Sequence, residues 1–79
     1  MKKITMKNIK SFNSYLIGEE KAQATISKYI HDVGEFKVWL GEQELCKAAV
    51  LGYKSYLCEH YAPASVNAAL SSLNSFFNF

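Results

Sequence analysis

The spacing of apolar residues is the feature that most constrains the fold of this chain of 79 residues. Apolar side chains recur at intervals of three and four in four separate segments, and no segment sustains an alternation of period two. This spacing is typical of amphipathic helices rather than half-buried strands. Short breaks between the segments favour close packing over an extended array. The sequence therefore predicts an all-α protein, a compact bundle of four helices.

The first two predicted helices span residues 6–17 and 23–40. The apolar face of the first consists of Ile9, Phe12, Tyr15 and Leu16, and Gly18 follows where a left-handed residue often ends a helix. The apolar face of the second consists of Ile26, Tyr29, Ile30, Val33, Phe36 and Leu40, with Lys28, Asp32 and Glu35 opposite. This second helix has the strongest periodicity and is predicted to be central. Gly34 inside it indicates either a close helix crossing or a tolerated glycine that costs about 1 kcal/mol relative to alanine.

The third and fourth predicted helices span residues 45–60 and 64–77, and Pro63 breaks the chain between them. Glu42 and Glu44 suit the positive N-terminal end of the third helix. Its core face consists of Leu45, Ala49, Tyr53 and Leu57. The fourth helix is expected to bury Val66, Leu70, Leu73 and Phe77 and to expose Asn67, Ser71, Asn74, Ser75 and Asn78. Its exposed face is therefore polar and uncharged.

The length and charge of the chain limit the number of its domains and the partners that it can bind. Residues 1–79 form one predicted domain, and because aromatic residues still arrive at Phe79 without a terminating signal, we expect a fragment of a longer polypeptide. The net charge of +2 permits binding to nucleic acid without requiring it. All nine basic residues are lysine. Because the chain has no arginine, it cannot clamp a phosphate or a guanine edge in the bidentate manner of a guanidinium.

The two cysteines are predicted to be free thiols. Cys46 and Cys58 fall in one predicted helix, where twelve residues separate their Cα atoms by about 18 Å, whereas a disulfide requires about 7 Å or less. Free thiols fit a reducing cytosol. Residues 1–4 are not followed by the apolar stretch of a signal peptide, and no apolar run is long enough to span a membrane. These observations predict a soluble, cytoplasmic protein.

No motif for catalysis, a cofactor or a metal stands out. Cys58 and His60 are two positions apart on one helix and so do not share a face, which favours a buried cysteine and a histidine at the helix C-terminus over a metal site. The sequence lacks a nucleophile elbow, and its glycines are isolated, unlike those of a phosphate-binding loop. We therefore expect no enzymatic activity, no cofactor and no metal for this chain alone.

The order of three segments resembles the N-terminal core-binding, or SAM-like, domain of phage integrases and other tyrosine recombinases. Residues 12–16, Phe-Asn-Ser-Tyr-Leu, resemble the opening helix of that family. Residues 22–40 resemble its second helix, with Tyr29, Phe36 and the Trp39-Leu40 pair in order. Residues 64–77 resemble its final helix, and the match covers nearly the whole chain.

The resemblance implies a helical bundle that closes one side of a clamp around duplex DNA, with the catalytic residues on a separate C-terminal domain. In such proteins the second and fourth helices approach the DNA grooves. The expected DNA-binding residues are Lys21, Thr25, Lys28, Lys54, Asn67, Ser71 and Asn74. The implied partners are double-stranded DNA, the catalytic domain of the same parent chain and other recombinase protomers. Ala22 departs from the usual serine cap, and Ala68 and Asn74 replace the usual basic residues of the last helix, which predicts modest affinity for DNA.

Two other interpretations remain open at the level of the sequence. Lys21, Lys28, Lys47 and Lys54 either converge on one side of the bundle or are merely solvated. In a second hypothesis, exposed Trp39, Phe76, Phe77 and Phe79 form an apolar patch that binds another domain or subunit without direct DNA contact. A third is a structural or regulatory helical domain with no role on nucleic acid.

Overall fold

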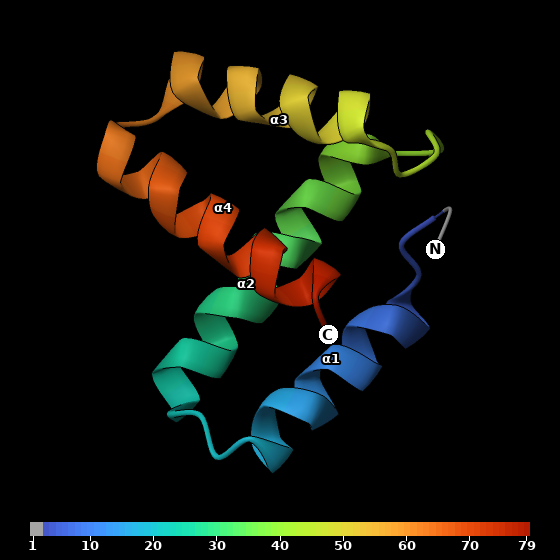
Figure 1. The fold of residues 1–79 in the computed structure, drawn as a ribbon, viewed down its shortest axis with the longest axis vertical. Coiled ribbons are helices and arrows are strands. Elements are labelled where there is room, and N and C mark those ends of the chain that lie inside the picture. The colour runs from blue at the N-terminus through green and yellow to red at the C-terminus, as the bar shows by residue number, and fades with distance from the viewer. Residues whose placement is uncertain (1–2) are drawn as a thin grey trace.

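Four helices account for most of residues 3–79, the range that the computed structural model describes (Figure 1). They are α1 (Met6–Gly18), α2 (Gln23–Leu40), α3 (Lys47–His60) and α4 (Pro63–Phe77). No strand occurs in this range, so the predicted all-α fold is confirmed. Within the same residues no helix is both long and apolar enough to cross a membrane.

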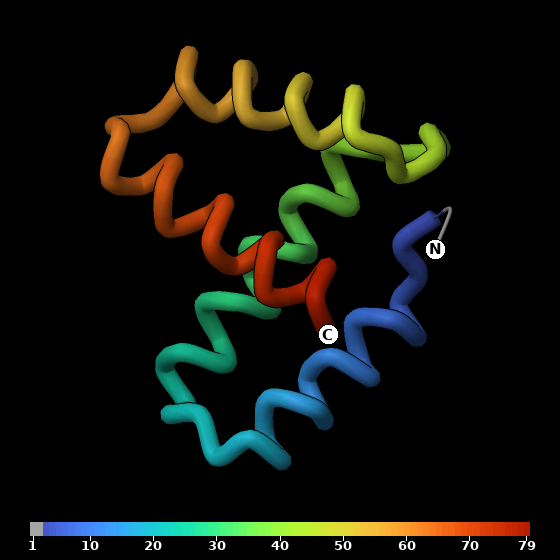
Figure 2. Tube along the Cα trace, viewed as in Figure 1, coloured from blue at the N-terminus to red at the C-terminus, as the bar shows by residue number. Residues whose placement is uncertain are grey.

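Helix α2 is the centre of the bundle, as its periodicity predicts. It contacts each of the other three helices, and α4 lies across it (Figures 1 and 2). Helices α3 and α4 form a hairpin joined through Tyr61 and Ala62, and they also pack on each other. The surface of α2 therefore positions both arms of this hairpin.

The core is rich in aromatic rings that join helices distant in sequence. Phe12, Phe36 and Phe76 are fully buried. The rings of Phe12 and Phe76 meet edge to face with centroids 5.2 Å apart, which ties α1 to the end of α4. Those of Phe36 and Tyr53 lie 4.8 Å apart and tie α2 to α3. Burial of each such side chain contributes about 1.5–3 kcal/mol to stability.

The helix ends follow local hydrogen-bonding rules. Thr5 and Asn8 form a capping box at α1, in which Thr5 Oγ1 accepts from the Asn8 N–H at 3.1 Å and Asn8 Oδ1 accepts from the Thr5 N–H at 3.0 Å. Helix α2 has no side-chain cap because Ala22 occupies that position. Pro63 is the first residue of α4, where its missing N–H costs no helical hydrogen bond.

Several predicted boundaries and turns were wrong. Gly18 lies inside α1, and the left-handed residue is Glu20, with φ of 57°. Helix α3 begins at Lys47 because Cys46 is extended, so Glu42 and Glu44 lie outside its first turn. Helix α4 begins one residue earlier than predicted.

Three predictions about glycine and cysteine can also be compared with the structure. A Cβ atom added at Gly34 would meet nothing within 4 Å, so Gly34 is a tolerated glycine and marks no close helix crossing. Cys46 and Cys58 are free thiols, as expected. Both are exposed, which corrects the expectation of a buried Cys58.

The prediction of the core was wrong at some positions. Tyr15, assigned to the core, is 42% exposed, and its hydroxyl donates to Glu19 Oε1 at 3.2 Å. Phe76 is buried where Phe77 was expected, and Phe77 is only half-buried. Adjacent helical residues point about 100° apart, so a modest rotation of α4 exchanges their roles.

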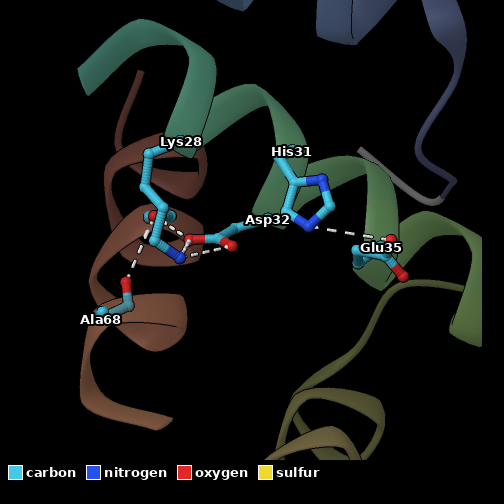
Figure 3. Close-up of polar contacts among 6 residues, drawn as sticks. Lys28, His31, Asp32, Glu35 and Ala68 are labelled. Carbon is cyan, nitrogen blue, oxygen red and sulfur yellow. Dashed lines mark hydrogen bonds and ion pairs between the residues drawn. The ribbon is translucent and has the colours of Figure 1, made fainter. Parts of the chain in front are cut away.

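Asp32 is the largest departure from the predicted pattern. Instead of lying on the exposed face of α2, it is 7% exposed and turned toward α4. Ser72 Oγ donates to Asp32 Oδ2 at 2.6 Å, and Lys28 Nζ lies 2.8 and 2.7 Å from the two carboxylate oxygens (Figure 3). A buried carboxylate is costly unless it is paired and hydrogen-bonded, and here it is both.

Removing the Ser72 hydroxyl tests the weight of this contact. Ser72→Ala is expected to lower the free energy of unfolding by about 2 kcal/mol, because it takes a hydrogen bond from a buried charged group. Ser71→Ala, one residue away on the exposed surface, should change it by less than about 0.5 kcal/mol. Urea unfolding followed by circular dichroism measures both, and equal effects would show that the contact contributes nothing specific.

Two glycine substitutions should act in opposite directions. Gly34→Ala fits the helix without a clash and is expected to stabilise the protein by about 0.5–1 kcal/mol. Gly41 has φ of 62° and ψ of −129°, a conformation strained for any side chain, so Gly41→Ala is expected to cost about 1–3 kcal/mol. The thermal midpoint should rise in the first variant and fall in the second.

The ionisation of Tyr53 should limit stability at high pH. Burial and the nearby carboxylates of Glu35 and Asp32 raise the pKa of Tyr53 from 10 to about 12. The unfolded chain therefore releases this proton first, and stability should fall as the pH rises from 10 to 12. Tyr53→Phe should flatten this decline in denaturant titrations, and an unchanged decline would assign it to other groups.

Candidate nucleic-acid interface

A groove of about 550 Å³ separates α3 from α4 and gathers four of the seven predicted DNA-binding residues. Lys54 reaches it from α3, and Asn67, Ser71 and Asn74 reach it from α4. Its floor is apolar and consists of Val50, Leu51, Leu70, Leu73 and Phe77. All four predicted residues are exposed at its surface.

The polar side of this groove follows from the helical repeat of α4. Asn67, Ser71 and Asn74 are spaced by four and three residues, so they lie on one face at about 100° per residue. The buried residues of α4 occupy the opposite face, and they are Val66, Ser72, Leu73 and Phe76. Packing of the core on α2 thus directs the amide and hydroxyl groups outward.

The α3 side of the groove supplies positive charge. Lys54 lines the groove, and Lys47, two turns earlier, lines an adjoining hollow of about 330 Å³. The two cavities share Val50 and Phe77, so they form a continuous surface. Both lysines are exposed and neither is in an ion pair with another of residues 3–79.

The charge of this surface has one sign. No acidic residue lines the groove or the adjoining hollow, and α4 contains no charged residue. Lysines with hydroxyl and amide neighbours provide donors for phosphate oxygens. The groove has no arginine to bind a carboxylate or phosphate in a bidentate manner, and it does not enclose a ligand. It therefore suits the extended backbone of a nucleic acid better than a small acidic ligand of defined shape.

The other three predicted residues lie apart from the groove. Lys21 is exposed in the connection between α1 and α2, and Thr25 is half-buried in the first turn of α2. Lys28 lies one turn further along. Since α2 is about 27 Å long, its start is far from its end, near which α3 begins (Figure 1). The four lysines considered in the sequence therefore do not converge.

The charge of Lys28 is already engaged within the protein. Its ammonium binds both carboxylate oxygens of Asp32, although half of its side chain is exposed. A phosphate at this site would compete with that ion pair. Lys28 is thus less available to DNA than Lys54.

The sequence analysis missed the apolar floor of the groove. Leu51 is 55% exposed on α3, and Val50 and Leu70 are half-buried beside it. The sequence of α3 does indicate such a surface, because the helix has more apolar residues than its buried face contains. Their joint position with the polar face of α4 depends on the hairpin and cannot be read from either helix alone.

Comparison with known families identifies the family of this chain. The model of the phage integrase N-terminal SAM-like domain matches residues 9–79. Searches of curated proteins and of solved structures gave no match. The family match covers all four helices apart from the first residues of α1. The chain therefore belongs to the N-terminal SAM-like domain family of phage integrases.

Proposed function

We propose that this chain is the DNA-binding domain of a site-specific tyrosine recombinase and that it clamps duplex DNA at the core recombination site. The cutting and rejoining of strands would belong to a catalytic domain that follows it in the parent chain. Other protomers of the recombinase would assemble beside it on DNA. The proposal also places the protein in the cytoplasm, where its two exposed thiols stay reduced.

The observation that carries this proposal is the composition of the α3–α4 groove. It unites Lys54 with Asn67, Ser71 and Asn74 and contains no carboxylate. The sequence predicts each of these four residues as a DNA contact, and the fold brings them to one groove. Lys21, Thr25 and Lys28 remain candidates for secondary contacts with the sugar-phosphate backbone outside the groove.

The chemistry of the groove predicts positioning of the duplex rather than recognition of sequence. Lysine ammonium groups neutralise phosphates as point charges, and bidentate recognition of guanine is typically made by arginine. Asparagine is the groove residue best suited to a base edge, since its amide pairs with adenine. We therefore infer modest affinity with a strong dependence on salt.

The alternative of a protein-interaction patch has less support. Among its four residues, Phe76 is buried and Trp39 and Phe77 are half-buried. Phe79 is exposed, but its ring lies 5.3 Å from that of Phe12 and 5.2 Å from that of Tyr15. A single exposed ring is too small a surface for a stable partner.

A salt titration of DNA binding tests the proposed function. Wild-type protein and a labelled duplex should give a log affinity that falls linearly with log salt concentration. Lys54→Gln should weaken binding at low salt and reduce the magnitude of the slope by about 0.9, the loss of one phosphate contact. Asn67→Ala should weaken binding without changing the slope, because its side chain carries no charge.

Lys10→Gln is the matched control. It removes the same charge from the exposed surface of α1, outside the groove. Its slope should equal that of the wild type. Absence of binding at low salt, or equal losses in Lys10→Gln and Lys54→Gln, would contradict a DNA contact centred on the α3–α4 groove.

A further inference from the structure

A second cavity, of about 410 Å³, lies where α2, α3 and α4 meet. Its α4 wall consists of Ser65 and Ala69. These residues lie on the opposite face of α4 from Asn67, Ser71 and Asn74, which line the α3–α4 groove. The functional groups that define it are Asp32, Glu35, Trp39, Tyr53, Tyr56 and Tyr61. We call this surface the aromatic–acidic cavity.

One wall of the aromatic–acidic cavity is a continuous set of rings. The ring of Trp39 lies 5.1 Å from that of Tyr53 and 6.3 Å from that of Tyr56. Tyr53 and Tyr56 stack with centroids 5.9 Å apart. The Trp39 ring packs closely against the backbone of α3 at Gly52. A Cβ atom added to Gly52 would lie only 3.4 Å from Trp39 Cη2. Ring faces of this kind attract cations.

The other wall carries negative charge. Asp32 is paired with Lys28, but Glu35 is 61% exposed and its nearest ionisable contact is His31 Nε2 at 3.8 Å (Figure 3). The three charged residues of the lining, Lys28, Asp32 and Glu35, leave one net negative charge when histidine is neutral. Glu35 is thus available to an incoming cation.

Tyr53 contributes a hydroxyl group to the cavity lining. The residue is 4% exposed and no hydrogen bond joins its hydroxyl to another of residues 3–79, but no buried side-chain oxygen in this range lacks a partner, so the hydroxyl oxygen itself reaches solvent. Tyr53 lines the cavity together with Glu35 and Asp32, and burial, followed by the charges of these two carboxylates, raises the pKa of its hydroxyl. Such a hydroxyl offers an acceptor to a ligand that donates hydrogen bonds.

We propose that the aromatic–acidic cavity receives an arginine side chain from a partner protein. A guanidinium is planar, stacks on aromatic rings and donates several hydrogen bonds, so it meets the rings, the Glu35 carboxylate and the Tyr53 hydroxyl at once. Exposed Val38, Tyr56 and Tyr61 lie on the lining and extend apolar contact to the rest of the partner segment. The volume lies in the range of small-ligand pockets.

The occupant must come from outside residues 1–79. These residues contain no arginine, so a second copy of this domain cannot supply the guanidinium. Nucleic acid is disfavoured because the net negative charge of the lining repels phosphate, in contrast to the α3–α4 groove. The proposal is independent of the DNA-binding function, because the two surfaces use different residues.

The single tryptophan of the chain allows a direct test, because Trp39 lines the cavity. Titration with N-acetyl-L-arginine amide should change Trp39 fluorescence in a saturable manner, with Kd on the order of 1 mM. N-acetyl-L-citrulline amide, which has nearly the same shape without the charge, should bind at least about fivefold more weakly. Backbone amide shifts in nuclear magnetic resonance spectra should map to the cavity lining.

Substitutions separate this site from the rest of the surface. Glu35→Gln should weaken binding of the arginine derivative about fivefold, and Tyr53→Phe should weaken it about twofold while retaining the fold. Glu44→Gln, an equal change of charge in the loop before α3, should leave binding unchanged. Equal binding of citrulline, no effect of Glu35→Gln, or a Trp39 response to single-stranded DNA but not to arginine would overturn the proposal.

Discussion

The hydrogen bond between Ser72 and Asp32 fixes how α4 lies on α2, and both proposed surfaces depend on that orientation. Apolar contacts are non-directional and tolerate rotation of a helix, whereas a buried carboxylate requires a donor at a defined position. Ser72 Oγ meets that requirement at 2.6 Å. Once Ser72 faces α2, the helical repeat directs Asn67, Ser71 and Asn74 toward the α3–α4 groove and Ala69 toward the aromatic–acidic cavity.

The separation of charge between the two surfaces originates in α2 and α3. Helix α4 is uncharged, so it contributes shape and hydrogen-bonding groups to both sides without favouring either sign. Lys54 of α3 makes the groove positive, and Glu35 of α2 makes the cavity negative. The net charge of +2 hides this difference, because it averages surfaces that would attract opposite ligands.

Local pattern was sufficient to predict the helices and the polar face of α4, because both follow from a repeat within one segment. It was insufficient wherever a partner from another helix decides the outcome. Asp32 looks like a solvated charge until Ser72, forty residues later, is placed beside it. Likewise, the separation of Lys21 from Lys54 depends on the direction of α2 through the bundle. Glu20 takes the left-handed conformation two residues after Gly18, and nothing in the structure explains that choice.

The absence of arginine gives the two surfaces complementary roles. In the proposed function, a lysine groove would hold a duplex by its phosphates but read little sequence, so selectivity for a recombination site would have to come from other parts of a recombinase. A cavity suited to a guanidinium would meanwhile recruit an arginine from outside residues 1–79, since these residues contain none. DNA and such a partner would occupy opposite faces of α4 and could be bound together. Any coupling between them would then act through the orientation of α4, which the Asp32–Ser72 contact restrains.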